Sequence, residues 1–155
     1  VHYEGAPIAA KNPPWDGGFV WRKNKKGEPW VAVSCEGIGA SLWFPNKDHL
    51  YDEPDSVRIG VAVPNGLTCI ANGNLEDTQT ENDYTRYNWF VSYPINNYNI
   101  TLNITKYAHF SDTYKSEDGE ELDLDYYVLP ENLEKAKNTY FKCFPKGFLL
   151  LFFRK

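Results

Sequence analysis

The stretch from Val57 to Ala71 reads VRIGVAVPNGLTCIA, and it decides the fold class because it carries the clearest periodic pattern in the first half of the sequence. Apolar residues occupy every second position of its first half: Val57, Ile59, Val61 and Val63. A period of two is typical of a β-strand with one buried face. The turn signal Pro64-Asn65-Gly66 follows, and a second apolar run starts at Leu67. The stretch predicts two strands joined by a turn.

Similar patterns continue toward the C-terminus. The segment from Thr85 to Val91 places alternate apolar residues on one face, and it ends before Pro94, which cannot donate a hydrogen bond to a sheet. From Tyr98 to Thr105, apolar residues alternate with Asn and Thr, which predicts one apolar and one polar face. Alternation returns from Leu122 to Val128 after a turn signal at Glu117-Asp118-Gly119. These segments predict three further strands.

The N-terminal third predicts a β-hairpin. Turn signals at Asp16-Gly17-Gly18 and Lys26-Gly27 flank the segment from Phe19 to Lys23, and Trp30 to Cys35 follows as a second strand. A helix is predicted only from Pro130 to Lys142, where a proline and acidic residues come first and basic residues follow. We therefore expect an all-β, antiparallel domain over residues 1–129, with a helix and tail over residues 130–155.

Composition excludes several classes of protein. The net charge of −5 over 155 residues argues against binding to nucleic acid, and the only basic cluster, Arg22 to Lys26, is followed by a turn glycine and is interpreted as the tip of a hairpin. The longest apolar stretch, Gly147 to Phe153, is too short to span a membrane, and the N-terminus lacks the features of a signal peptide. Cys35, Cys69 and Cys143 form no C-x-x-C pair. Because the chain contains no Met and ends on an apolar run, we expect a fragment of a longer protein.

Candidate catalytic motifs are weak. His2, His49 and His109 lack the spacing of zinc ligands. The acidic cluster from Asp48 to Glu53 is better explained as a turn between two prolines. Ser41 follows a glycine but has no second glycine and no helix behind it, so it does not match a nucleophile elbow. Two glycosylation sequons, at Asn99 and Asn103, lie on the predicted alternating strand, which already explains their polarity.

An ordered series of motifs resembles the second part of the N-terminal domain of M1-family zinc aminopeptidases. The series covers nearly the whole chain: Ser34-Cys35-Glu36, Gly39, Phe44-Pro45, Asp48, Asp52-Glu53-Pro54-Asp55-Ser56, then VPNGLTCIANGNL, TRYNWFVSYPINNYNITLNITKY and LDYYVLPENLEKAK. The family often has an Arg shortly before its Phe-Pro step and a Cys after it, where this chain has Ala40-Ser41 and Asn46. Whether the full-length protein is a working aminopeptidase or a diverged peptide-binding relative stays open.

The resemblance implies a saddle-like β-sandwich that packs on a thermolysin-like catalytic domain of the same polypeptide. That catalytic domain would hold the zinc ion, an H-E-x-x-H motif and a Gly-Ala-Met-Glu-Asn segment, none of which this sequence contains. The chain alone is therefore expected to be no enzyme and to hold no cofactor. The compartment stays open, and a periplasmic or secreted location is expected if the full-length protein is bacterial.

The resemblance also implies a role for Glu36. In the family, the acidic or amide residue after this Ser-Cys step reaches from the N-terminal domain into the active site and binds the free α-amino group of the peptide. A carboxylate suits that role because it forms a charge-assisted hydrogen bond with an ammonium group. Without the resemblance, capping of the turn at Gly37 to Gly39 explains Glu36 equally well or better.

A second hypothesis is a carbohydrate- or protein-binding β-sandwich. The chain has 5 Trp, 11 Tyr and 9 Phe residues, and exposed aromatic rings can stack on the apolar faces of sugars. Alternating strands also place aromatic residues in cores and in cross-strand pairs, which explains most of them without a ligand. Coplanar aromatic rings on one exposed face would favour this second hypothesis.

Overall fold

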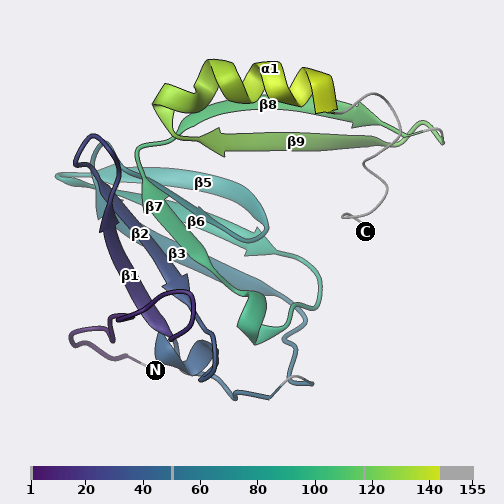
Figure 1. Cartoon of the computed structure of the whole chain (residues 1–155). Coiled ribbons are helices and arrows are strands. Elements are labelled where there is room, and N and C mark those ends of the chain that lie inside the picture. Colours follow the sequence, from purple (N-terminus) through teal and green to yellow (C-terminus); the bar gives the residue numbers. More distant parts are fainter. Residues whose placement is uncertain (1, 50, 117, 144–155) are drawn as a thin grey trace. The chain divides into compact units, whose positions relative to one another are not determined.

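The structure is a computed structural model that describes residues 2–49, 51–116 and 118–143. Its contacts divide the chain into two compact units, Val1–Lys106 and Tyr107–Lys155. Both are built from antiparallel strands, as Figure 1 shows. The predicted division between residues 129 and 130 concerns domains of a longer protein, and it stays a prediction.

The first unit contains two antiparallel sheets (Figure 1). One sheet has the strand order β1-β2-β7-β4 and the other has the order β3-β6-β5. The bounds in chain order are β1 Gly18–Lys23, β2 Pro29–Ser34, β3 Val57–Pro64, β4 Thr68–Ala71, β5 Asn74–Glu81, β6 Tyr84–Val91 and β7 Leu102–Thr105. The predicted hairpin of the N-terminal third is β1 paired with β2, so this prediction is confirmed.

The core lies between these two sheets. Val63 of β3 packs in one cluster with Cys69 of β4 and Leu102 of β7, and all three side chains are buried. Two aromatic side chains of β6 add hydrogen bonds between the sheets: the Trp89 Nε1 donates to the carbonyl oxygen of Cys69 at 3.1 Å, and the Tyr87 hydroxyl donates to that of Leu67 at 3.1 Å. The apolar faces predicted for β3 and β6 are therefore the faces that meet the other sheet.

The turn at Pro64-Asn65-Gly66 connects the two sheets. Strand β3 pairs along its whole length with β6, while β4 pairs with β7. The Leu67 N–H closes the turn onto the carbonyl oxygen of Pro64 at 3.1 Å, and the Asn65 N–H donates to that of Asp83 at 2.9 Å. The two predicted strands exist, but they do not pair with each other, because each finds a longer-range partner.

The predicted strand from Tyr98 to Thr105 is wrong in its first half. Residues Asn97–Asn99 form a 3-10 turn, η2, and β7 starts only at Leu102. The cause is local: the Asn96 side-chain oxygen accepts a hydrogen bond from the Tyr98 N–H at 2.8 Å, which stabilises a turn in place of a strand. The predicted polar face is wrong at Thr105, which is fully buried and donates to the Pro29 carbonyl oxygen at 2.7 Å.

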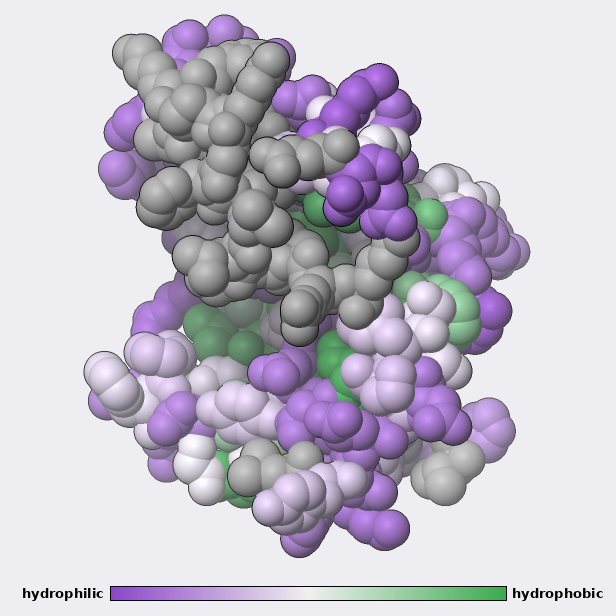
Figure 2. All heavy atoms as spheres, turned by 90° about the vertical axis from the view of Figure 1, so that its right-hand side faces the viewer, coloured by the Kyte–Doolittle hydropathy of each residue, from purple (hydrophilic) through white to green (hydrophobic). Residues whose placement is uncertain are grey.

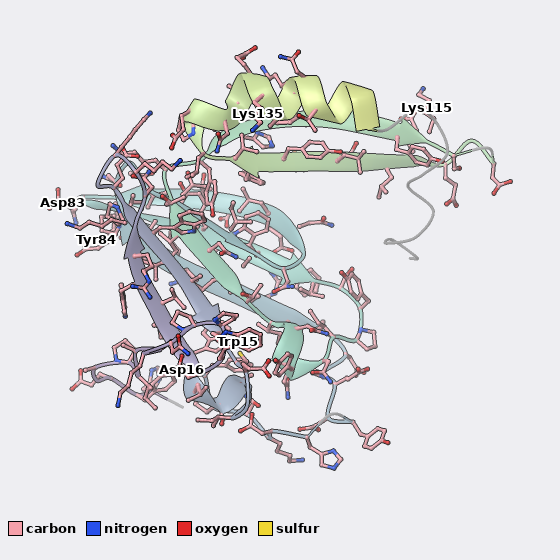
Figure 3. The ribbon with its side chains drawn as sticks, viewed as in Figure 1. Trp15, Asp16, Asp83, Tyr84, Lys115 and Lys135 are labelled. Atoms are coloured by element: carbon pink, nitrogen blue, oxygen red, sulfur yellow. The ribbon has the colours of Figure 1, made fainter. Side chains whose placement is uncertain are left out.

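Strand β5 was not predicted. Its sequence NLEDTQTE contains only one apolar residue, and all eight of its residues are exposed. It forms one edge of the β3-β6-β5 sheet and pairs with β6 through a bulge between Leu75 and Asp77. Figure 3 labels Asp83 and Tyr84, which lie where β5 turns into β6. This segment has no apolar pattern of its own, and it joins the sheet because it pairs with β6.

The second unit is a hairpin with a helix. It comprises β8 (Ala108–Lys115), β9 (Glu121–Val128), a 3-10 turn η3 (Pro130–Asn132) and α1 (Leu133–Cys143). Figure 1 shows α1 running along the hairpin, and the Lys137 ammonium lies 5.9 Å from the centre of the Phe110 ring of β8. The predicted strand from Leu122 to Val128 and the predicted helix from Pro130 are confirmed. The expected apolar tail from residue 144 onward lies outside the described residues.

Within the residues that the structure describes, the fold is therefore all-β with one short α-helix that follows the last strand, as predicted. On the face drawn in Figure 2, hydrophilic residues predominate and apolar residues show only in small separate areas. No helix within the described residues is long and apolar enough to cross a membrane.

Candidate functional site

Glu36 lies on a loop that leaves the core directly after β2. Cys35 is still buried, whereas Glu36 is exposed. The Gly39 N–H donates to the carbonyl oxygen of Cys35 at 2.9 Å and closes a tight turn around Glu36. Gly37 and Gly39 have φ angles of 77° and 103°, a region that side chains other than glycine rarely adopt. The glycines that follow Glu36 in the sequence thus allow the turn that presents its carboxylate.

The loop forms one wall of a pocket of about 360 Å³. Three segments that are distant in the sequence line this pocket, and all belong to the first unit: residues 36–40, residues 47–49 and residues 96–98. The first segment runs into the 3-10 turn η1 (Ala40–Leu42), and the third runs into η2. The pocket therefore lies at the end of the β1-β2-β7-β4 sheet, where β2 leaves the sheet and where the chain approaches β7.

Tyr98 is the hydrogen-bond partner that the structure gives to the Glu36 side chain. The Tyr98 hydroxyl donates to Glu36 Oε2 at 3.0 Å, across 62 positions of sequence. This hydrogen bond to the carboxylate, together with partial burial, raises the pKa of Tyr98 above its usual value. The hydrogen bond thus favours the protonated form of the hydroxyl, which serves as a donor to Glu36.

The segment that carries Tyr98 is firmly held. Ile95 and Ile100, on either side of it, are buried in the core. Asn97 is also buried, and its Nδ2 donates to the carbonyl oxygen of Lys47 at 3.3 Å, which ties two walls of the pocket together. The Asn99 N–H donates to the carbonyl oxygen of Asn96 at 2.9 Å. The position of the Tyr98 ring is thus set by the core below it.

Asp48 belongs to the wall of the pocket that residues 47–49 form, and it holds this wall to the end of the Glu36 loop. Its Oδ1 accepts a hydrogen bond from the Ser41 N–H at 3.0 Å, and its Oδ2 accepts one from the Ser41 hydroxyl. These hydrogen bonds lower the pKa of Asp48. A side chain at position 39 would collide with this carboxylate, because a Cβ there would lie 2.5 Å from Asp48 Oδ1. Asp48 therefore locks the end of the Glu36 loop.

Asp48→Asn should make the protein less stable in a pH-dependent way. Since the pKa of Asp48 is lower in the folded state, its contribution to stability is present above the unfolded pKa of about 4 and is lost as pH falls through the folded value. We expect the difference in Tm between wild type and variant to be largest near neutral pH and to shrink below about pH 4. Thermal melts of both proteins across this range measure it. Asp55→Asn, an exposed aspartate of the same segment, is the control, and an equal Tm difference at both extremes would contradict the role of Asp48.

The other candidate motifs remain structural. His49 Nδ1 accepts a hydrogen bond from the Tyr51 N–H at 3.3 Å, as in a turn, and no group of three potential metal ligands occurs within the described residues. The Ser41 hydroxyl is bonded to Asp48 and not to an imidazole. Burial raises the pKa of the Cys35 thiol and raises that of Cys69 to about 12, so neither is a reactive thiolate.

Exposed aromatic rings do occur, but two of the tryptophans lie on opposite faces of one hairpin. Trp21 is 57% exposed and pairs with Val31, whereas Trp30 is 38% exposed and belongs to the next pair along the ladder. Successive pairs point to opposite faces of a sheet. Trp15, labelled in Figure 3, is exposed in the loop before β1. The β1-β2 hairpin thus does not combine Trp21 and Trp30 into one stacking surface.

A second hollow, of about 370 Å³, lies over the β3-β6-β5 sheet and is lined by polar side chains. Its charges are largely engaged with one another. Arg58 forms an ion pair with Glu76 and lies 4.3 Å from the centre of the Phe90 ring. Asn88 Nδ2 donates to Asp77 Oδ1 at 2.6 Å. We interpret this hollow as a polar network on the surface of the sheet.

Sequence reasoning missed Tyr98 and Asn97 as parts of the site. Tyr98 was placed on the apolar face of a strand, and its tie to Glu36 depends on the turn that replaces that strand. The pair Asn96-Asn97 after Pro94 was a usable signal, because asparagines favour turns over strands. Of the two sequons, Asn99 is exposed beside the pocket, whereas Asn103 lies within β7 between two neighbouring strands.

The fold and the pocket together define a β-domain that presents a carboxylate at the end of a two-sheet core. No protein-family model matches the sequence, and no curated protein sequence matches it. Among solved structures, the chain is similar to a two-domain M1 zinc metallopeptidase crystallised as a variant with bound L-arginine. That similarity has a TM-score of 0.60 at 17% identity and covers 86% of this chain and 32% of the metallopeptidase chain.

This similarity shows a related fold. At 17% identity the likeness concerns architecture alone, and the chain spans about a third of the length of the metallopeptidase that it matches. The observed fold is thus an all-β domain that resembles the N-terminal domain of M1 metallopeptidases.

Proposed function

We propose that this chain is part of the N-terminal β-domain of an M1-like metallo-aminopeptidase, in which Glu36 binds the free α-amino group of a peptide substrate. The observation that carries the proposal is the similarity in fold to an M1 zinc metallopeptidase over 86% of the chain. The position of Glu36 supports it, because the carboxylate is exposed at a pocket of about 360 Å³.

The chemistry of the pocket suits a cationic group. The Asp48 carboxylate is bonded to Ser41, and the Lys47 ammonium lies 3.8 Å from Asp52. Glu36, in contrast, accepts a single hydrogen bond from a described side chain, that of the Tyr98 hydroxyl, so its other carboxylate oxygen remains available to a ligand. A carboxylate in a partly enclosed pocket forms a strong charge-assisted hydrogen bond with an ammonium group. A peptide amino terminus is such a group.

The reaction itself would belong to another part of the full-length protein. This chain would contribute recognition and a packing surface for a zinc catalytic domain of the same polypeptide, and that domain would hold the metal. Exposed apolar side chains at the pocket rim, Ile38 at 63% and Tyr98 at 44%, are consistent with a surface that such a domain covers.

Measuring zinc content tests whether this chain contributes recognition while another domain of the full-length protein holds the catalytic metal. We expect a protein comprising residues 1–155 to hold no stoichiometric zinc and to cleave no aminoacyl substrate, and we expect the longest product of the same gene to hold about one zinc per chain. Elemental analysis after dialysis measures both, and an H-E-x-x-H motif in the downstream reading frame should accompany the zinc. A tightly bound zinc in residues 1–155, or none in the longer product, would contradict the proposal.

A further inference from the structure

The Tyr98 hydroxyl stands beside Glu36 in the pocket, and the geometry of this pair goes beyond a single carboxylate. Tyr98 donates its proton to Glu36 Oε2 at 3.0 Å. A tyrosine hydroxyl has one donor and can also accept hydrogen bonds. Since its proton is engaged, the Tyr98 oxygen offers only acceptor capacity to a ligand in the pocket. No described side chain donates to Glu36 Oε1.

We propose that Glu36 and Tyr98 together form a two-acceptor binding site for a primary ammonium group. In this site Tyr98 positions the Glu36 side chain and also accepts a second hydrogen bond from the ligand. The inference rests on the proposed function, and it deepens that function by naming the class of amine. An ammonium group carries three N–H donors, so it can bond to both acceptors at once. A tertiary ammonium carries one N–H and can bond to only one of them.

Tyr98 is suited to position Glu36 because Tyr98 lies on a turn that is anchored to the core, whereas the Glu36 side chain is exposed to solvent. The Glu36 loop is a turn that includes two glycines with positive φ, and its carboxylate is exposed to solvent. Tyr98 sits on η2, whose Asn97 is buried and bonded to the Lys47 carbonyl oxygen. The hydrogen bond from Tyr98 therefore restricts the side-chain conformations of Glu36 before a ligand arrives, which reduces the entropy lost on binding.

Other charged groups of the pocket do not compete for this role. Asp48 accepts hydrogen bonds from the Ser41 N–H and hydroxyl. Lys47 is directed to Asp52, and His49 Nδ1 accepts from the Tyr51 N–H. The Tyr98 hydroxyl oxygen is the one that the structure places in direct contact with the Glu36 carboxylate.

The test compares two ligands by isothermal titration calorimetry in the full-length protein, depleted of zinc so that neither ligand is hydrolysed during the titration. L-alaninamide presents a primary ammonium, and N,N-dimethyl-L-alaninamide presents a tertiary one. Tyr98→Phe removes only the hydroxyl, and we expect it to weaken L-alaninamide binding about 2- to 10-fold while changing the dimethyl ligand by less than about 2-fold. Tyr93→Phe is the matched control, because Tyr93 is 56% exposed and does not line the pocket. It should leave both affinities unchanged.

A double-mutant cycle separates this inference from the proposed function. In a Glu36→Ala background, Tyr98→Phe should change L-alaninamide binding by less than about 2-fold, since the pair acts as a unit. One outcome would overturn the two-acceptor binding site and leave the proposed role of Glu36 standing. In it, Glu36→Ala weakens binding, whereas Tyr98→Phe either has no effect or weakens the binding of both ligands equally. If wild type does not bind L-alaninamide, or Glu36→Ala leaves its binding unchanged, both are overturned.

Discussion

Glu36→Ala in the full-length protein should lower kcat/KM for peptides with a free amino terminus about 10- to 150-fold. The expected loss follows from a hydrogen bond to a charged partner, which contributes about 1.5 to 3 kcal/mol. About 1.36 kcal/mol corresponds to a tenfold change in rate, which gives this range. Steady-state kinetics on an aminoacyl substrate measure the effect.

The loss should be specific to recognition. Because Glu36 is exposed, Glu36→Ala should leave the Tm within a few degrees of wild type. Glu53→Ala is a matched control, since Glu53 is an exposed glutamate of the following segment that does not line the pocket, and its kinetics should equal those of wild type. If the kinetics of Glu36→Ala are unchanged, or if activity is lost only in step with unfolding, Glu36 is a turn residue and its proposed role is wrong.

Leu102→Ala should have the largest effect on stability. Leu102 is 3% exposed and packs with Val63 and Cys69 between the two sheets of the first unit. Truncating a buried leucine removes apolar contacts and leaves a cavity, which costs about 2 to 5 kcal/mol. For a unit of this size we expect a fall in Tm on the order of 5 to 20 °C. Thermal unfolding followed by circular dichroism measures this fall.

Leu75→Ala is the control for this experiment. Leu75 has the same side chain but lies on the exposed strand β5, where it is 39% accessible. We expect its substitution to change stability by about 0.5 kcal/mol or less. Equal destabilisation by the two substitutions would contradict the placement of the core between the two sheets.

The sequence could predict the parts of the fold in which one face is buried. Strands β3 and β6 alternate because their inner faces meet the other sheet, and Val63 and Trp89 are buried there. Strand β5 gave no such signal, since all its residues are exposed and it joins the sheet by pairing with β6. Periodicity detects burial, so a strand stabilised mainly by backbone hydrogen bonds escapes it.

The sequence also did not indicate which strands pair with one another. A turn such as Pro64-Asn65-Gly66 predicts a reversal of the chain, but it does not say whether the next strand stays in the same sheet. In the structure, β4 joins β7, and the buried Cys69 faces the core from the β1-β2-β7-β4 sheet. Only contacts between residues far apart in the sequence, such as that of Trp89 with the Cys69 carbonyl, distinguish these outcomes.

For the site, the resemblance of Ser34-Cys35-Glu36 to a family motif singled out Glu36, and its role stays a prediction. The residues alone favoured a turn, and the structure does show a turn there. Tyr98 was missed, because its approach to Glu36 requires a capped 3-10 turn where alternation indicated a strand. A side-chain hydrogen bond by Asn96 outweighs the strand pattern at this point.

The exposed edge strand β5 also bears on how the protein behaves in concentrated solution. An unpaired strand edge can pair with the edge of another molecule and start aggregation. Three carboxylates lie along this strand, at Glu76, Asp77 and Glu81, and a bulge interrupts its ladder beside Leu75. Two copies that approached edge to edge would bring like charges together along irregular backbones. Strand β5 is therefore protected against self-association by its own charge, and neutralising those three carboxylates would remove the protection.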